Sequence, residues 1–299
     1  MSDGEQQYLN VLREVLEKGH YRKTRNANTL SLFGKHLEFS LKDNTLPVLT
    51  TKRMFLRGIF EELKFFLGGH TNSKILENNN VSIWKPNTTR EFLDGRGLNH
   101  YEEGDMGPMY FFQVFHFNAP YEGCRADYTN KGFNQFEELI HLLKTDRFSR
   151  RMILTTYNPL QAKEGVLYPC HGITIQFGIE NDNELCCHMH QRSTDLFLGE
   201  SWNLTSYSLL VHILCNYVNH SNNYTGPWLI PSKLTLSLGD CHIYETHVDA
   251  VKTQLERTPF PFPKLNIKTK ITDFNELRFE DFELIDYKYH PPIKADMVA

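Results

Sequence analysis

The segment 204–220, LTSYSLLVHILCNYVNH, is apolar around almost its whole helical circumference. A surface helix has one apolar stripe and one polar face, whereas a helix that is apolar all round is buried. We therefore predict a central helix that other elements surround. The 299 residues contain no internal repeat and no linker-like stretch. The sequence thus favours a single domain, 1–299, of the α/β (α+β) class with a substantial sheet.

Periodic patterns predict the elements around this helix. Apolar residues at helical spacing predict further helices at 7–19, 57–69 and 133–146. Alternation or short apolar runs predict strands at 29–41, 150–158, 171–179, 183–193, 233–244 and 264–270. Because Gly34 interrupts the first of these, we expect two strands there, joined by a turn or bulge. The Gly-, Asn- and Pro-rich region 85–132 is expected to form loops and short elements over a cleft.

Composition excludes several classes of protein. A net charge of −4 excludes a strongly basic nucleic-acid binder, so any anion site must be local. The first residues lack the pattern of a secretion signal, and no run of about 18 apolar residues predicts a membrane span. The six cysteines show no paired zinc spacing. We therefore expect free thiols and a reducing, cytoplasmic location.

Cys170 is the first candidate for chemistry, because it stands between a proline and a histidine in GVLYPCHGITIQF. A thiol with an ordinary pKa of about 8.5 needs a nearby positive charge or dipole to become a nucleophilic thiolate. Arg150, Arg151 and Arg192 are natural suppliers. With Ser193 they resemble a phosphate cradle, since guanidinium forks match tetrahedral oxyanions. A buried apolar role for the cysteine and surface ion pairs for the arginines remain the alternatives.

Asp240, His242 and Tyr244 alternate along a predicted strand, so they point to one face of it. A carboxylate, an imidazole and a phenol in one row suit sugar-hydroxyl recognition or proton transfer. His188 and His190 alternate in another predicted strand and suggest a metal site as the competing interpretation. Histidines at alternate strand positions are more commonly satisfied by hydrogen bonds, so we expect no metal.

Several motifs in this order resemble the thymidylate synthases: Pro-Cys-His at 169–171, Gln-Arg-Ser-x-Asp at 191–195, Asn203 soon after Leu-Gly, and Gly-Asp-x-His-x-Tyr at 239–244. The resemblance spans nearly the whole chain. Segments 89–105 and 124–136 are similar to insertions in eukaryotic and viral members. The resemblance implies a three-layer α/β/α fold with a large mixed sheet at the interface of a homodimer.

The reaction that the resemblance implies is reductive methylation of dUMP, with methylenetetrahydrofolate as methylene and hydride donor and no metal. Cys170 would add to C6 of the uracil. The other implied catalytic residues are Glu62, Tyr110, His171 and Asn203. The implied substrate-binding residues are Arg25, Arg150, Arg151, Gln191, Arg192, Ser193, Asp195, Asn203, His242 and Tyr244, with Arg150 and Arg151 reaching the phosphate from the partner subunit. The implied cofactor-binding residues are Lys52, Ile83, Trp84, Leu167, Asp195, Leu198, Gly199 and Val298, the last in a C-terminal lid.

Some residues depart from the family pattern near the implied site. The loop that carries Arg25 is shorter than usual, which leaves Arg22 as a second candidate for the phosphate. Other departures are Lys64, Phe65, Lys85, Phe111, Val114, Phe115, Ser201 and Trp202, of which the last is expected to crowd the folate pocket. These changes keep two alternatives open: a dUMP or dCMP hydroxymethylase, and a catalytically idle nucleotide-binding relative. Asn203 favours uracil, because an amide can both donate and accept.

Overall fold

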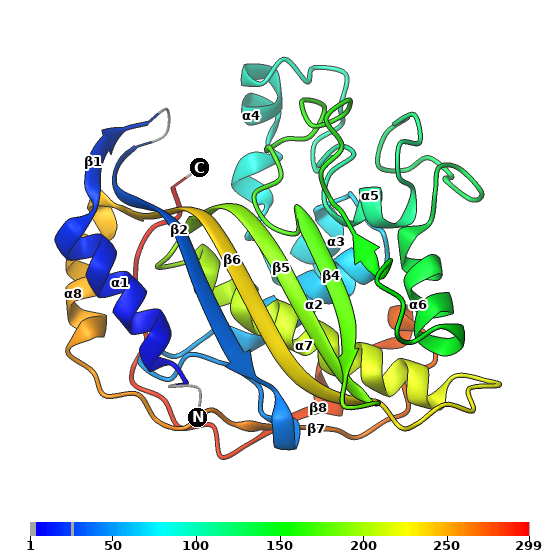
Figure 1. Ribbon diagram of the computed structural model, residues 1–299. Helices are drawn as coiled ribbons and strands as arrows, with labels where there is room; N and C mark the ends of the chain where they lie inside the picture. Colours follow the sequence, from blue (N-terminus) through cyan, green and yellow to red (C-terminus); the bar gives the residue numbers. More distant parts are fainter. Residues whose placement is uncertain (1–3, 25–26, 299) are drawn as a thin grey trace.

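The computed structural model describes residues 4–24 and 27–298, which form a mixed sheet of six strands with helices packed against it (Figure 1). The strand order is β1-β2-β6-β5-β4-β3, and neighbours are antiparallel except for the parallel pair β5 and β6. A second, two-stranded sheet pairs β7 with β8. The strands are β1 His20–Lys23, β2 Asn28–Ser40, β3 Ile153–Leu154, β4 Thr174–Glu180, β5 Glu184–Asp195, β6 Ile230–Tyr244, β7 Lys264–Ile267 and β8 Phe282–Ile285.

The helices vary widely in length. The α-helices are α1 Gln6–Lys18, α2 Leu56–Leu67, α3 Lys74–Asn78, α4 Arg90–Gly95, α5 Phe111–Phe115, α6 Gln135–Thr145, α7 Gly199–His220 and α8 Val248–Leu255. Short 3-10 helices are η1 Lys42–Asn44, η2 Lys85–Asn87, η3 Glu245–His247, η4 Phe274–Glu276 and η5 Phe279–Asp281. Within the described ranges, no helix combines the length and the apolar character that a membrane span requires.

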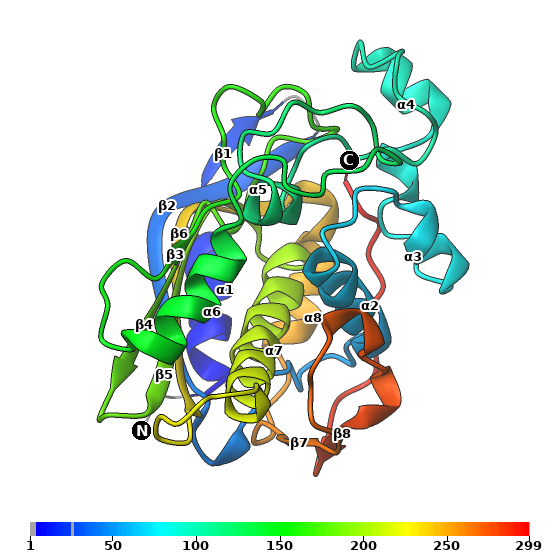
Figure 2. The same ribbon diagram turned by 90° about the vertical axis from the view of Figure 1, so that its right-hand side faces the viewer.

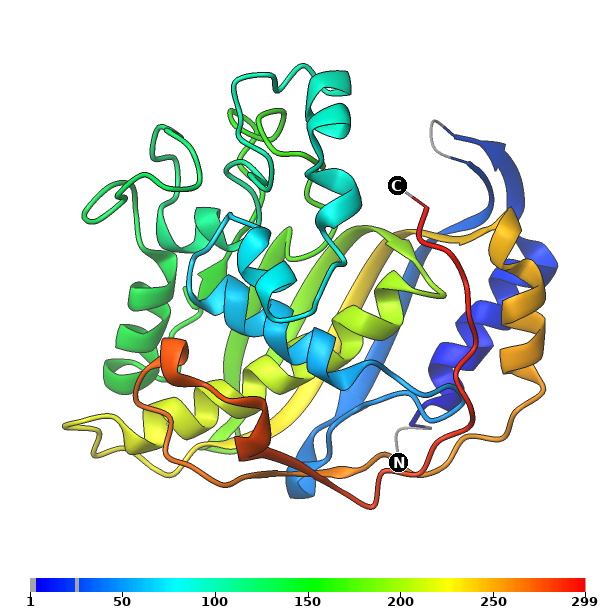
Figure 3. The ribbon, with the colours of Figure 1, turned by 180° about the vertical axis from the view of Figure 1, so that it is seen from behind.

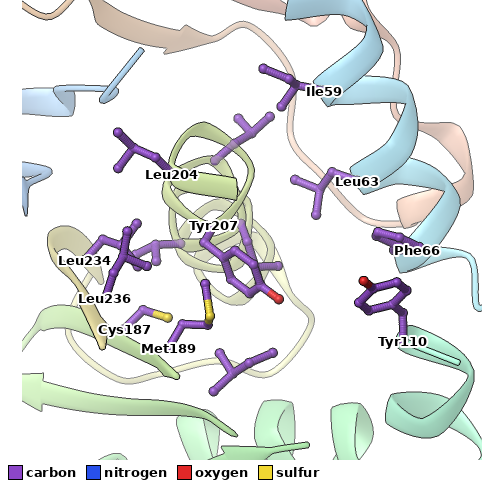
Figure 4. Packing of buried hydrophobic residues seen from close by; sticks show 14 of the residues in the cluster. Ile59, Leu63, Phe66, Tyr110, Cys187, Met189, Leu204, Tyr207, Leu234 and Leu236 are labelled. Carbon is purple, nitrogen blue, oxygen red and sulfur yellow. The ribbon is translucent and has the colours of Figure 1, made fainter. Parts of the chain in front are cut away.

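The structure confirms α7 as the buried central helix. Figure 4 shows Leu204 and Tyr207 of α7 between Leu63 of α2 on one side and Met189 and Leu236 of the sheet on the other. All five side chains are buried. The sheet, α7 and α2 therefore form successive layers, as the view from the side shows (Figure 2). The predicted α/β class with a large mixed sheet is confirmed.

The helices cover one face of the sheet. On β2, Leu37 and Phe39 are buried, whereas Glu38 and Ser40 are exposed on the opposite face. Figure 3 shows α2 and α7 lying over the covered face. In the part of the chain that the structure describes, the other face carries no helix (Figure 2). An open sheet face of this kind is available for another protein surface.

Two predictions for the strands were wrong. The region 29–41 forms one strand rather than two, because β2 pairs continuously with β6 on both sides of Gly34. Gly34 has a φ of +79°, which glycine tolerates without strain. The region 150–158 contributes only the two residues of β3. The side chain of Gln135 takes both backbone groups of Thr155, accepting from its N–H at 2.8 Å and donating to its carbonyl at 2.9 Å, so these groups are not free for a strand.

The C-terminal ends of β5 and β6 bring candidate residues together. In this parallel pair, Ser193 lies beside Asp240, and Asp195 lies beside His242. α7 begins at Gly199, shortly after β5 ends. Residues from two strands and from the start of the central helix therefore meet at one end of the sheet.

Candidate active site

Cys170 lies in the loop before β4, and β5 holds it in place. The backbone N–H groups of Arg192 and Ser193 donate to the Cys170 carbonyl at 2.8 and 3.4 Å. The Arg192 guanidinium also donates to the Pro169 carbonyl at 3.1 Å. The Cys170 side chain is partly exposed, and its sulfur lies 3.3 Å from the Tyr110 hydroxyl. The thiol thus lies beside a phenol and within the field of a guanidinium.

The charge of one arginine does not ionise this thiol. Burial raises the pKa of Cys170, while the hydrogen bond with Tyr110 and the positive charge of Arg192 lower it, and the net shift is upward. Arg150 and Arg151 are both exposed, and Arg151 lies 3.7 Å from Asp146. Of the three predicted arginines, Arg192 therefore lowers the pKa of Cys170 within one protomer, whereas Arg150 and Arg151 are exposed.

Aromatic rings pack around Tyr110, whose hydroxyl contacts Cys170. The ring of His171 stacks on that of Tyr110 at 4.3 Å, and its Nδ1 lies 2.9 Å from the Tyr207 hydroxyl. Burial lowers the pKa of His171 to about 3, so the imidazole is neutral. Figure 4 shows Tyr110 next to Phe66 of α2. Tyr110 has a φ of +49°, a strained conformation that is commonly retained at functional sites.

Glu62 of α2 is a buried carboxyl held by two indoles. Trp84 Nε1 donates to Oε1 at 2.8 Å, and Trp202 Nε1 donates to Oε2 at 2.6 Å. Burial raises the pKa of Glu62 to about 7, against the effect of both hydrogen bonds. Its charge also raises the pKa values of Cys170 and Tyr110, so it lies within electrostatic reach of both. A carboxyl with this pKa can take up or release a proton near neutral pH.

The predicted row on β6 is present. His242 Nδ1 lies 3.0 Å from Asp240 Oδ1, and the rings of His242 and Tyr244 are 5.0 Å apart. The hydrogen bond with His242 is the main cause that lowers the pKa of Asp240. Arg22 donates to Asp240 Oδ2 at 2.6 Å, so this second phosphate candidate is paired. Arg25, the first candidate, lies outside the described residues.

Asp195 organises the turn between β5 and α7. Its Oδ1 accepts the backbone N–H groups of Phe197 at 3.0 Å and Leu198 at 3.3 Å, and Gly199 then begins α7. Lys52 is only 4% exposed, and its Nζ donates to the carbonyl of Phe197. Burial lowers the pKa of Lys52 to about 7. This ammonium therefore supports the turn, and it is not displayed to solvent.

The C-terminal segment docks near Asp195 through His247. His247 Nε2 lies 2.8 Å from the carbonyl oxygen of Asp296, and its Nδ1 lies 3.7 Å from Asp195 Oδ1. Burial lowers the pKa of His247, but Asp195 and the Asp296 carbonyl outweigh it, so the net shift is upward. Val298, two residues further on, is partly buried. The imidazole of His247 thus links the predicted lid to the turn after β5.

The remaining predicted residues lie around these groups. Asn203 is 7% exposed on α7. Trp84 is 9% exposed, with its ring 5.8 Å from that of Tyr110, and Ile83 and Leu167 pack as partly buried residues against the core. Gln191 is buried, and neither atom of its amide group has a hydrogen-bond partner among the described residues.

The residues that depart from the family pattern are accommodated by packing and local pairing. Phe111 stacks on Phe66 at 5.6 Å, and Val114 is fully buried. Lys64 donates to the carbonyl of Leu277 at 2.8 Å, which explains a lysine in an otherwise apolar helix. Lys85 lies 3.9 Å from Glu77. The other departures, Phe65, Phe115 and Ser201, are buried or partly buried.

A separate cavity of about 480 Å³ lies beside η4 and is lined by Lys64, Lys270 and Arg278 among others. It contains none of the predicted site residues, so the candidate site is assigned from side-chain chemistry. Across residues 4–24 and 27–298, no group of three or more His, Cys, Asp or Glu side chains is arranged to hold a metal ion.

Sequence reasoning missed four residues of this region: the indole donor of Trp202, the phenol of Tyr207, His247, and the buried carboxyl of Glu200. Tyr207 is a polar residue within an apolar segment, and Glu200 is a charged one within a turn sequence. Because a buried hydroxyl or carboxyl needs a hydrogen-bond partner, these two residues could have been predicted as candidates from the sequence. Trp202 and His247 give no such signal, because their partners lie far away in the sequence.

Comparisons with known proteins show the family of the chain. The sequence model of the family described as thymidylate synthase matches residues 6–299. The thymidylate synthase of human herpesvirus 8 is 45% identical over 296 residues, which cover 99% of this chain and 84% of that protein. The thymidylate synthase of Agaricus bisporus is 44% identical over 301 residues, covering 98% of each chain. That of Saccharomyces cerevisiae is 40% identical over 303 residues, covering 98% of this chain and 96% of that protein. The chain therefore belongs to the thymidylate synthase family.

Proposed function

We propose that this chain is a methyltransferase that converts dUMP to dTMP, with methylenetetrahydrofolate as the co-substrate that supplies the methylene group and the hydride. The observation that carries the proposal is the position of Cys170 within the electrostatic reach of Glu62 and 3.3 Å from the hydroxyl of Tyr110, in a chain of this family. A nucleophile, a phenol and a titratable carboxyl are the groups that addition to a pyrimidine and later proton transfers require.

Cys170 begins the reaction. Its thiolate forms a bond to C6 of the uracil, and the electron pair of the C5–C6 double bond moves toward C5 and O4. The amide of Asn203 supports this charge by holding O4 and N3–H. C5 then bonds to the folate methylene as one of the bonds from that carbon to folate nitrogen opens, and loss of the C5 proton, which Tyr110 assists, breaks the other and leaves an exocyclic methylene at C5. Hydride transfer from the folate gives the methyl group and dihydrofolate, and the Cys170 sulfur leaves C6 as the double bond re-forms.

Other residues bind the two substrates. Arg192 and Ser193 hold the phosphate, while His242 and Tyr244 bind the deoxyribose hydroxyl. Asp195 contacts the pterin, and the docked C-terminal segment that His247 holds excludes water from the transfer. The remaining assignments, for Gln191, His171, Lys52, Ile83, Trp84, Leu167, Leu198, Gly199 and Val298, are those that the family resemblance implies.

The active form is a homodimer joined through the open sheet face, and Arg150 and Arg151 complete the phosphate site of the partner. Three features support this. The face that carries Glu38 and Ser40 has no covering helix among the described residues (Figure 2). The same face is open on β5, where His188 and His190 are exposed while Cys187 and Met189 between and beside them are buried. The net upward shift in the pKa of Cys170 in one protomer leaves a need for further positive charge, which two partner arginines supply.

Product analysis tests the reaction. The enzyme is incubated with dUMP and methylenetetrahydrofolate, dihydrofolate is followed by absorbance, and the nucleotide is identified by mass. Equal amounts of dTMP and dihydrofolate are expected. Hydroxymethyl-dUMP without dihydrofolate, or nucleotide binding without turnover, would refute the proposal. Cys170→Ser is expected to abolish turnover while leaving dUMP binding largely in place.

Subunit complementation tests the shared site. The variant Cys170→Ser is mixed with a variant that carries Arg150→Ala and Arg151→Ala, after each is shown to be inactive alone. If the arginines serve the partner, each mixed dimer holds one intact site, and random mixing restores about a quarter of the activity. If the arginines serve their own chain, no mixed dimer has an intact site and activity stays absent.

A further inference from the structure

Trp202 of α7 contacts the carboxyl of Glu62, although the proposed reaction assigns it no role. We infer that Trp202 is a positioning residue: its indole N–H, opposite that of Trp84, fixes the orientation of the Glu62 carboxyl and favours its ionised form. This inference rests on the proposed function, in which Glu62 moves protons near the pyrimidine.

The hydrogen bonds use both oxygens of Glu62. Trp202 Nε1 lies 2.6 Å from Oε2, and Trp84 Nε1 lies 2.8 Å from Oε1. An indole N–H can only donate, so both oxygens must accept. An ionised carboxylate accepts at both oxygens, whereas a carboxylic acid carries a proton on one of them. The two indoles therefore match the ionised carboxylate and hold it from two sides.

Packing fixes the indole in this orientation. Its ring meets that of Phe55 edge-on at 6.4 Å. A Cβ atom built on Gly58 would lie 2.7 Å from Cη2 of Trp202 and 2.5 Å from Cδ1 of Phe55, so any other residue at position 58 would displace these rings. The missing side chain of Gly58 thus leaves room for the indole between α2 and α7, and its N–H group reaches Glu62.

The groups around Glu62 leave the indoles as its main support. Cys170, Tyr110 and Tyr207 each feel the negative charge of Glu62, which raises their pKa values. None of these three is a cation, and the pKa of about 3 keeps His171 neutral. Burial raises the pKa of Glu62 itself to about 7, and the hydrogen bonds from Trp84 and Trp202 oppose that rise. Loss of either indole N–H therefore shifts the carboxyl toward its protonated form.

Two substitutions separate the donor from the ring. Trp202→Phe keeps an aromatic ring and removes the N–H, whereas Trp202→Gln keeps an N–H donor and removes the ring. We take the carboxylate of Glu62 as its active form, so its titration gives the ascending limb of the plot of kcat/KM against pH. Trp202→Phe is expected to move this limb upward by about one to two pH units, the effect of one hydrogen bond to a charged group. At pH values below the shifted limb, kcat/KM of Trp202→Phe is then about tenfold or more lower than that of the wild type, whereas the plateau at high pH is retained.

The outcomes distinguish positioning from packing. Trp202→Gln is expected to return the limb toward the wild-type pH, even if its plateau is lower. Trp228→Phe is the matched control, because Trp228 is 59% exposed, and its profile should be that of the wild type. An equal loss at all pH values in Trp202→Phe, with the limb in place, would overturn the inference and leave Trp202 as a packing residue.

A fluorescence titration tests the contact without turnover. The chain has three tryptophans, so the double variant Trp84→Phe, Trp228→Phe leaves Trp202 as the only indole. Because this variant lacks the Trp84 N–H, the pKa of Glu62 rises above about 7 by about one to two units, and the emission is expected to change between about pH 7 and 10 as Glu62 ionises. Adding Glu62→Gln should remove that transition. A wild type that forms no dTMP refutes the proposed function, whereas a missing transition, or one that survives Glu62→Gln, refutes this inference.

Discussion

Glu200 is a buried carboxyl in the first turn of α7, and we predict that Glu200→Gln stabilises the protein above neutral pH. The side chain is 0% exposed, and its Oε2 accepts from the hydroxyl of Thr194 at 3.0 Å. Its Oε1 has no partner among the described residues. Burial raises the pKa of Glu200 to about 7, while the hydrogen bond from Thr194 lowers it.

The sign and size of the effect follow from this pKa. A carboxyl with a raised pKa holds its proton in the folded state at pH values where the unfolded chain releases it. The folded state therefore loses stability as the pH rises from 4.5, the ordinary value, to about 7. The loss is about 3 kcal/mol and is complete above that range. A glutamine at position 200 is neutral at every pH. Its amide oxygen can accept from Thr194, and its amide NH2 can donate to the unpartnered oxygen of Gln191.

Urea unfolding at fixed subunit concentration measures the difference. At pH 5 the two proteins should be about equally stable, and at pH 8 the variant should be more stable by about 3 kcal/mol. Glu62 titrates in the same range, but it is present in both proteins and cancels. Glu184→Gln is the control of opposite sign, because hydrogen bonding to Lys42 lowers the pKa of this partly buried carboxyl, so its loss should reduce stability at pH 8. A stability gap between wild type and Glu200→Gln that is equal at both pH values would refute the reasoning.

Three further predictions concern the thiol, the C-terminus and the core. Tyr110→Phe removes the hydroxyl that lowers the pKa of Cys170, so alkylation of Cys170 by iodoacetamide, followed by peptide mass, should require a higher pH. The pKa of His247 is raised, so its hold on the C-terminal segment is strongest at low pH and weakens as the pH rises and the imidazole loses its charge. Carboxypeptidase should therefore release C-terminal residues faster at pH 8 than at pH 6, and His247→Ala should be cleaved fast at both. Leu210→Ala, at a fully buried position in α7, should cost about 2–5 kcal/mol in urea unfolding.

Local patterns predicted much of the architecture. Apolar residues all round the segment 204–220 predicted a buried helix, and the alternation of apolar and polar residues predicted β5 and most of β6. Both patterns are local because side-chain periodicity depends only on the local backbone. The motif around Cys170 identified the thiol, and the ordered motifs identified the family that the comparisons confirm. Positions of strand ends were less predictable. The side chain of Gln135 took the backbone groups of Thr155, and a contact between residues 20 positions apart leaves no local pattern.

The chain alone thus determined which residues carry reactive groups and which segments are buried, since both follow from side-chain chemistry and spacing. The tertiary structure decided the ionisation of those groups. Glu62, Lys52 and His171 have shifted pKa values because the fold removes them from water. The tertiary structure also decided the hydrogen-bond partners of these groups. The indole of Trp202 donates to Glu62, 140 positions away in the sequence, because α7 packs on α2. Desolvation and long-range contact are properties of the folded chain, and no local pattern of residues encodes them.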